Sequence, residues 1–139
     1  MKEKIFGVLY LLIGLFMTLG LIFVFPVCEM TAEGTYMKCH WMSQAELGIG
    51  IIISILGIIS LISKSKELKI GINISLILQF LLVILIPDIL IGVCKNEHMR
   101  CHSLSMPILN ILGGIGIIVT LINFIYFSKS KNKQGEKHE

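Results

Sequence analysis

The sequence predicts an all-α protein of the polytopic membrane class, a bundle of four transmembrane helices. Composition and the length of the apolar blocks support this prediction. Of the 139 residues, 55% are hydrophobic and 15% are charged, whereas soluble domains carry about 25% charged residues. The apolar residues form four long blocks, and the first, residues 5–25, contains no charged residue. At about 1.5 Å per residue, such a block spans the roughly 30 Å hydrocarbon core of a bilayer.

Each block is predicted to be a helix, because an isolated strand leaves backbone groups unpaired in lipid. The expected transmembrane helices cover residues 5–25, 45–62, 68–86 and 107–127. The chain, 1–139, is then one integral membrane domain, and its two Cys-bearing loops cover residues 26–44 and 87–106.

Local signals set the expected helix starts. The first block has the basic flank of a signal peptide, but it is long for one and no small-residue cleavage site follows, so we expect it to be retained. Ser43 and Glu46 have the spacing of a capping box at the start of the second helix. Pro107 fits the first turn of the fourth helix, where its missing N–H costs little.

The two halves of the chain repeat the same order of features. Each half has an apolar block, Val-Cys, a short polar loop, Met-basic-Cys-His, a second apolar block and a basic tail. The motif reads "MKCH" at 37–40 and "MRCH" at 99–102, and the tails read "SKSKE" at 63–67 and "SKSKN" at 128–132. This order predicts a parallel tandem repeat of two helix hairpins.

The distribution of Lys and Arg predicts the orientation in the cell membrane. The termini and the middle loop carry nine of the twelve basic residues, and the Cys-bearing loops carry only Lys38, Lys95 and Arg100. The positive-inside rule then places both termini in the cytoplasm and both Cys-bearing loops outside. The basic tails set the topology and contact anionic lipid, so nucleic acid is not an expected partner.

Four cysteines allow three disulfide pairings. Locality favours Cys28–Cys39 and Cys94–Cys101, because each pair lies within one short loop on the oxidising side. A thiol–disulfide oxidoreductase is a less favoured alternative, since the chain has no C-x-x-C pair to lower a thiol pKa.

A metal site is the other alternative for these loops. His40 and His102 follow two of the cysteines, and Met37 and Met99 lie two residues before them. Imidazole, thioether and thiolate ligands suit copper, and zinc if the thiols stay reduced. Oxidised cysteines are poor ligands, so the favoured prediction is a protein without a cofactor.

Small residues in the helices predict close packing. Gly50, Ser54 and Gly57 fall on one face of the second helix, and Asn110 and Gly114 on one face of the fourth. Such a face serves either the bundle itself or docking to another membrane protein. No Asp, Glu, Lys, Arg or His is expected deep in the membrane, which argues against a proton-coupled transporter.

The segments "PVC" at 26–28 and "MKCHWMSQAE" at 37–46 make the chain resemble the domain of unknown function 4418 family of small prokaryotic membrane proteins. The resemblance implies four transmembrane helices and an accessory role beside ABC transporters of the FtsX/MacB type. We therefore expect a non-enzymatic subunit that docks to an ABC-transporter permease or to itself. A copper or zinc handling protein is the alternative, and a thiol–disulfide oxidoreductase is third.

Overall fold

The computed structural model describes residues 2–24, 34, 38–91 and 101–135. Its α-helices are α1 (Lys2–Leu19), α2 (Lys38–Ile62), α3 (Lys66–Leu85) and α4 (Met106–Gly135), and its π-helical turns are η1 (Gly20–Val24), η2 (Ile86–Leu90) and η3 (Cys101–Ser105). Four helical stretches are long and apolar enough to cross a membrane, and no strand occurs in the described segments. The prediction of an all-α, multi-pass membrane protein is confirmed.

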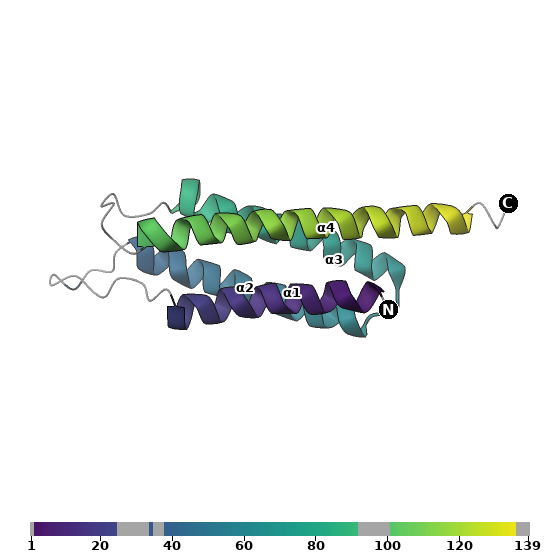
Figure 1. Ribbon diagram of the computed structural model, residues 1–139, viewed down its shortest axis with the longest axis horizontal. Helices are drawn as coiled ribbons and strands as arrows, with labels where there is room; N and C mark the ends of the chain where they lie inside the picture. Colours follow the sequence, from purple (N-terminus) through teal and green to yellow (C-terminus); the bar gives the residue numbers. More distant parts are fainter. Residues whose placement is uncertain (1, 25–33, 35–37, 92–100, 136–139) are drawn as a thin grey trace.

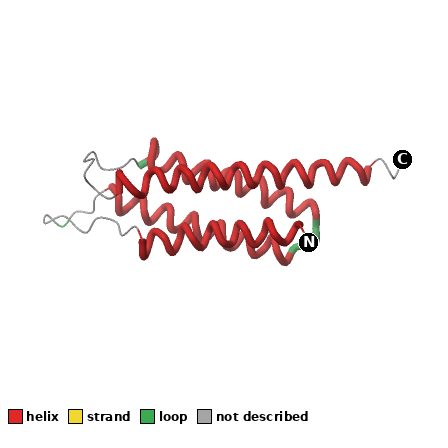
Figure 2. Tube along the Cα trace, in the orientation of Figure 1, coloured by secondary structure: helices red, strands yellow, loops and turns green. Residues whose placement is uncertain are grey.

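The helices form an elongated up-and-down bundle (Figure 1). The start of α1, the turn at residues 63–65 and the end of α4 lie at the same end of the bundle, beyond which α4 projects (Figure 1); we call this the lysine end. The end of η1, the start of α2, η2 and η3 lie at the opposite end, the cysteine end (Figure 2). Both ends of the described chain therefore lie at the lysine end. The side of the membrane that this end faces stays a prediction.

The bundle consists of two helix hairpins. α1 packs mainly on α2, and α3 packs mainly on α4. The residues fully buried between the helices include the large side chains Tyr10, Met17, Ile53, Leu76 and Phe80. The opposite faces of the same helices expose Leu, Ile and Phe side chains, as expected for a surface in contact with lipid: Leu12, Phe16, Ile55, Leu78, Ile118 and Ile122.

Small residues bring the backbones of α1 and α2 close together. A Cβ atom added at Gly57 would lie 2.8 Å from the backbone N of Leu11, and one at Gly50 would lie 2.7 Å from Oγ1 of Thr18. Ser54 lies on the same face, and its hydroxyl donates to the carbonyl of Gly50 at 2.9 Å. Gly50, Ser54 and Gly57 thus all face α1.

A different pair of glycines lies between α3 and α4. A Cβ atom at Gly113 would lie 2.7 Å from Cγ1 of Ile84, and one at Gly116 would overlap the ring of Phe80. The prediction that Gly114 packs this helix does not hold for contacts within the chain, because a Cβ atom there would meet nothing within 4 Å. The register of α4 turns Gly113 and Gly116, rather than Gly114, toward α3.

Helix boundaries also differ from those expected. α2 begins at Lys38 rather than near Ala45, so Ser43 and Glu46 lie inside the helix and the predicted capping box is wrong. Both side chains are buried because they belong to the inward-facing stripe of α2. The third apolar block does not stop at Pro87: it continues as η2, and the N–H of Ile91 donates to the carbonyl of Ile86 at 3.0 Å.

Candidate functional site: polar side chains inside and on the bundle

A cluster of polar side chains joins the two hairpins in the half of the bundle nearer to the lysine end. The hydroxyl of Tyr10 on α1 donates to Oδ1 of Asn73 on α3 at 3.2 Å. Nδ2 of Asn123 on α4 donates to the same Oδ1 at 3.0 Å and to the Tyr10 hydroxyl at 3.1 Å. These three residues, at most 2% exposed, bring three helices together.

The cluster is only partly satisfied. Nδ2 of Asn73 and Oδ1 of Asn123 are buried and have no hydrogen-bond partner among the described residues. Thr120, one turn before Asn123, donates to the carbonyl of Gly116 at 2.6 Å. Asn73, Thr120 and Asn123 stand out in the sequence as polar residues within apolar blocks, whereas Tyr10 does not, since an aromatic ring near the start of a helix resembles an interfacial anchor.

Glu46 is the second buried polar feature. Its side chain is 0% exposed, and neither carboxylate oxygen has a hydrogen-bond partner in the part of the chain that the structure describes. It lies within the apolar stretch of α2 that is long enough to span a membrane, His40–Ile62. The expectation of no acidic residue concerned residues deep in the membrane; Glu46 lies six residues from the start of that stretch and is buried inside the bundle. A signal was present in the sequence, because Met42, Glu46, Ile49 and Ile53 recur at helical spacing.

A buried basic residue lies at the other end of the bundle. Lys69 on α3 is 6% exposed, and its Nζ lies 5.5 Å from the centre of the Phe127 ring on α4. A cation over an aromatic face is stabilised by the negative potential of the ring. Lys69 therefore contributes to the α3–α4 contact as well as to the positive charge at the lysine end.

Asn110 and Gly114 lie one turn apart on α4, and both are half-buried. Oδ1 of Asn110 is shielded from solvent but has no hydrogen-bond partner among the described residues. Gly114 leaves its backbone open, as do Gly48 on α2 and Gly71 on α3. Of these three glycines, Gly114 is the one that has a buried polar atom without a described partner one turn earlier on the same helix, namely Oδ1 of Asn110.

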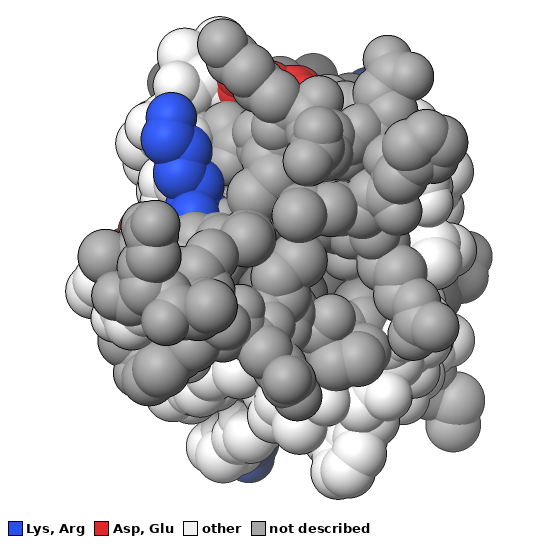
Figure 3. Space-filling view, turned by 90° about the vertical axis from the view of Figure 1, so that its left-hand side faces the viewer, with Lys and Arg blue, Asp and Glu red and all other residues white. Residues whose placement is uncertain are grey.

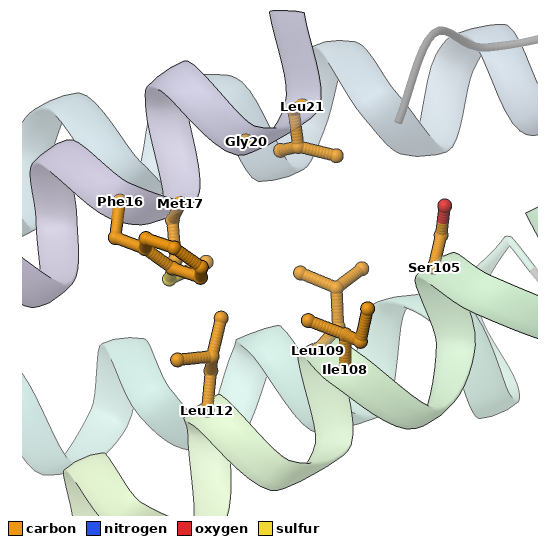
Figure 4. Close-up of a pocket in the computed structure, with 8 residues that line it drawn as sticks. All are labelled: Phe16, Met17, Gly20, Leu21, Ser105, Ile108, Leu109 and Leu112. Atoms are coloured by element: carbon orange, nitrogen blue, oxygen red, sulfur yellow. The ribbon is translucent and has the colours of Figure 1, made fainter. Parts of the chain in front are cut away.

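An apolar pocket separates the two hairpins near the cysteine end. Phe16, Met17, Gly20 and Leu21 line one side and Ser105, Ile108, Leu109 and Leu112 line the other (Figure 4). The side chains of α1 and α4 point toward each other across this gap, in agreement with the small contact between these two helices. The lining is apolar, and the space is too small to hold a substrate.

Most of the predicted disulfide and metal residues lie outside the described residues. This applies to Cys28, Cys94, Met37 and Met99 and to the side chains of Cys39, Cys101 and His102. Those predictions therefore stay predictions.

His40 is the predicted ligand whose side chain the structure describes. Its ring is half-buried and lies edge-on to Trp41, with the ring centres 6.0 Å apart. No group of three or more His, Cys, Asp or Glu side chains occurs among the residues described.

Few charges lie on the described surface of the cysteine end. Figure 3 views this end and shows little blue or red surface beside the residues drawn in grey. The exposed charged residues of the elements that meet here are Lys38 in α2 and Asp88 in η2. Within the described residues, the neighbours of Glu46 one turn away on α2 include the apolar core residues Met42 and Ile49.

Comparison with known protein families identifies the family of this chain. The model of the family described as Domain of unknown function (DUF4418) matches residues 10–126, which cover α2 and α3 and parts of α1 and α4. The chain belongs to the DUF4418 family. No curated protein and no solved structure matches the chain. Membership in DUF4418 confirms the resemblance inferred from the segments "PVC" and "MKCHWMSQAE", and it assigns no activity.

Proposed function

We propose that this protein is a non-enzymatic membrane subunit that docks a transmembrane helix of a partner against α4. The observation that carries the proposal is the pair Asn110 and Gly114. A Cβ atom at Gly114 would meet nothing within 4 Å among the described residues, and Oδ1 of Asn110, a buried acceptor one turn earlier, has no described partner. A small residue and a polar side chain one turn apart are the features by which membrane helices associate.

The occupant that fits this face is an apolar helix with a small residue and a hydrogen-bond donor. The small residue would cross at Gly114, and the donor, such as a Ser, Thr or Asn side chain, would reach Oδ1 of Asn110 after the Asn110 side chain turns outward, because that oxygen is buried in the free chain. Hydrogen bonds between membrane helices contribute about 0.6 kcal/mol on average, and up to about 2 kcal/mol. Close packing along the rest of α4 would supply the remaining affinity.

The partner we propose is an ABC-transporter permease of the FtsX/MacB type, the class that the sequence resemblance implies. A second copy of this chain is the alternative occupant. We also propose the orientation with both termini in the cytoplasm, supported by the excess of lysine at the lysine end. In that orientation the cysteine end faces outside.

Co-purification from native membranes tests the proposal. The tagged wild type should recover a permease, and Gly114→Leu should lose it because the larger side chain blocks the crossing. Gly71→Leu is the matched control, since Gly71 is also open but lies on α3. Retention of the permease by Gly114→Leu would overturn the proposed face. Recovery of a second copy in place of the permease would replace the heteromeric partner by self-association.

A further inference from the structure

Glu46 has no role in the docking of a partner on α4, because its carboxyl group is fully buried. We propose that Glu46 is a proton-binding site inside the bundle. In the folded conformation the carboxyl group holds the proton; if water reaches the carboxyl oxygen, the proton passes to water and leaves a carboxylate.

The placement of Glu46 supports the first half of this proposal. On α2 it lies between Met42, one turn before it, and Ile49, one turn after it, and both belong to the buried apolar core. Neither carboxylate oxygen accepts a hydrogen bond from any described residue. An ionised carboxylate without a partner is strongly unfavourable in such surroundings, and the group becomes neutral by taking up a proton.

No described charge is placed to hold Glu46 in its ionised form. α2 packs against α1, α3 and η2. The ionisable residues of α1 lie toward the lysine end: Lys2, Glu3, Lys4 and Tyr10. Those of α3 lie toward the same end: Lys66, Glu67 and Lys69. η2 has one exposed carboxyl group, that of Asp88, and the first turn of α2 has two basic residues, Lys38 and His40.

The depth of Glu46 supports the second half. It lies eight residues from Lys38, which is about 12 Å along the axis of α2 at 1.5 Å per residue. A small separation of the helices at the cysteine end would therefore bring water to the carboxyl group. η2 packs on α2 at this end, and it is the segment where the regular α-helical pattern of α3 gives way at Pro87.

Infrared spectroscopy of the purified protein in lipid bilayers tests the proposal directly. At neutral pH the wild type should show the C=O stretch of a protonated carboxyl group, and Glu46→Gln should lack it. Asp88→Asn is the matched control, because Asp88 is an exposed carboxylate at the same end and its removal should leave the band unchanged.

Two results would overturn the proposal: absence of the band from the wild type at neutral pH, or its persistence in Glu46→Gln. If Glu46→Gln does not fold, wild type carrying carbon-13 in its glutamate carboxyl groups replaces it. The band must then shift with the label, and a band that does not shift rejects Glu46 as its source. Loss of permease binding by Gly114→Leu with the band unchanged would separate this site from the docking face.

Discussion

Nδ2 of Asn123 donates a hydrogen bond to Oδ1 of Asn73 at 3.0 Å, between residues 50 positions apart on the two helices of one hairpin. The same amide also donates to Tyr10, which belongs to the other hairpin. Asn123 is therefore the donor that ties the α3–α4 contact to α1. Its placement leads to the first of five predictions.

Replacement of Asn123 by Ala should lower the free energy of unfolding by about 0.5–2 kcal/mol, because it removes two hydrogen bonds in a low-dielectric interior. Unfolding in mixed micelles with increasing denaturing detergent measures the change. Thr18→Val is the control: the hydroxyl of Thr18 lies outside the cluster and donates to the carbonyl of Gly14 on its own helix, so a smaller loss is expected. Equal losses in both variants would reject a special role for the Asn123 hydrogen bonds.

Replacement of Gly14 by Leu should separate α1 from α2. An added Cβ at Gly14 lies 2.7 Å from the backbone N of Ser54 and 2.9 Å from the carbonyl of Gly50, which a rotation of side chains cannot relieve. Overpacking of this kind costs about 1–3 kcal/mol or more. The same unfolding assay measures it, with Gly71→Leu as a control whose Cβ meets open space. A stability of Gly14→Leu equal to that of the control would contradict the close approach of α1 and α2.

Thiol labelling tests the orientation. If the cysteine end faces outside, a membrane-impermeant reagent should label the cysteines of intact cells after mild reduction, because both predicted Cys-bearing loops are external. A cysteine added near the C-terminus should react only after lysis. The reverse pattern would invert the proposed topology.

The expected disulfides are Cys28–Cys39 and Cys94–Cys101, and peptide mapping without reduction should recover both local links. Loss of one of them through Cys28→Ser should cost about 2–4 kcal/mol of stability, as for typical closed loops. A main product that links Cys39 to Cys101 would instead indicate a bridge between the two hairpins.

The histidines of the repeated motif should not be needed for stability. The double variant His40→Gln/His102→Gln should keep the melting temperature of the wild type, because interfacial side chains retain their water. The copper or zinc alternative predicts the opposite, since bound metal stabilises the folded state. Metal content and melting temperature, measured with and without chelator, distinguish the two interpretations. One metal per wild-type chain that is lost in the variant would establish the metal site.

The four helices could be predicted from the sequence because the apolar blocks are long enough to leave no other structure in lipid. The start of α2 could not be predicted, because the spacing of Ser43 and Glu46 fits two arrangements. One is a capping box at a helix start, and the other is a pair of neighbours in the buried stripe of a helix that has already begun. The partners of Tyr10 and the orientation of Gly114 were also beyond prediction. In helices that are apolar on every side, hydrophobic periodicity does not show which face turns inward.

The pairing of neighbouring helices has a consequence for biosynthesis. α1 and α2 leave the ribosome one after the other and pack mainly on each other, and the same holds for α3 and α4. Each pair is therefore a unit that can form most of its helix contacts as soon as its second helix is made. The hydrogen bonds from Tyr10 to Asn73 and from Asn123 to Tyr10 close only when the second unit meets the first. Their formation marks the completion of assembly, and a chain cut short before α4 lacks the Asn123 donor.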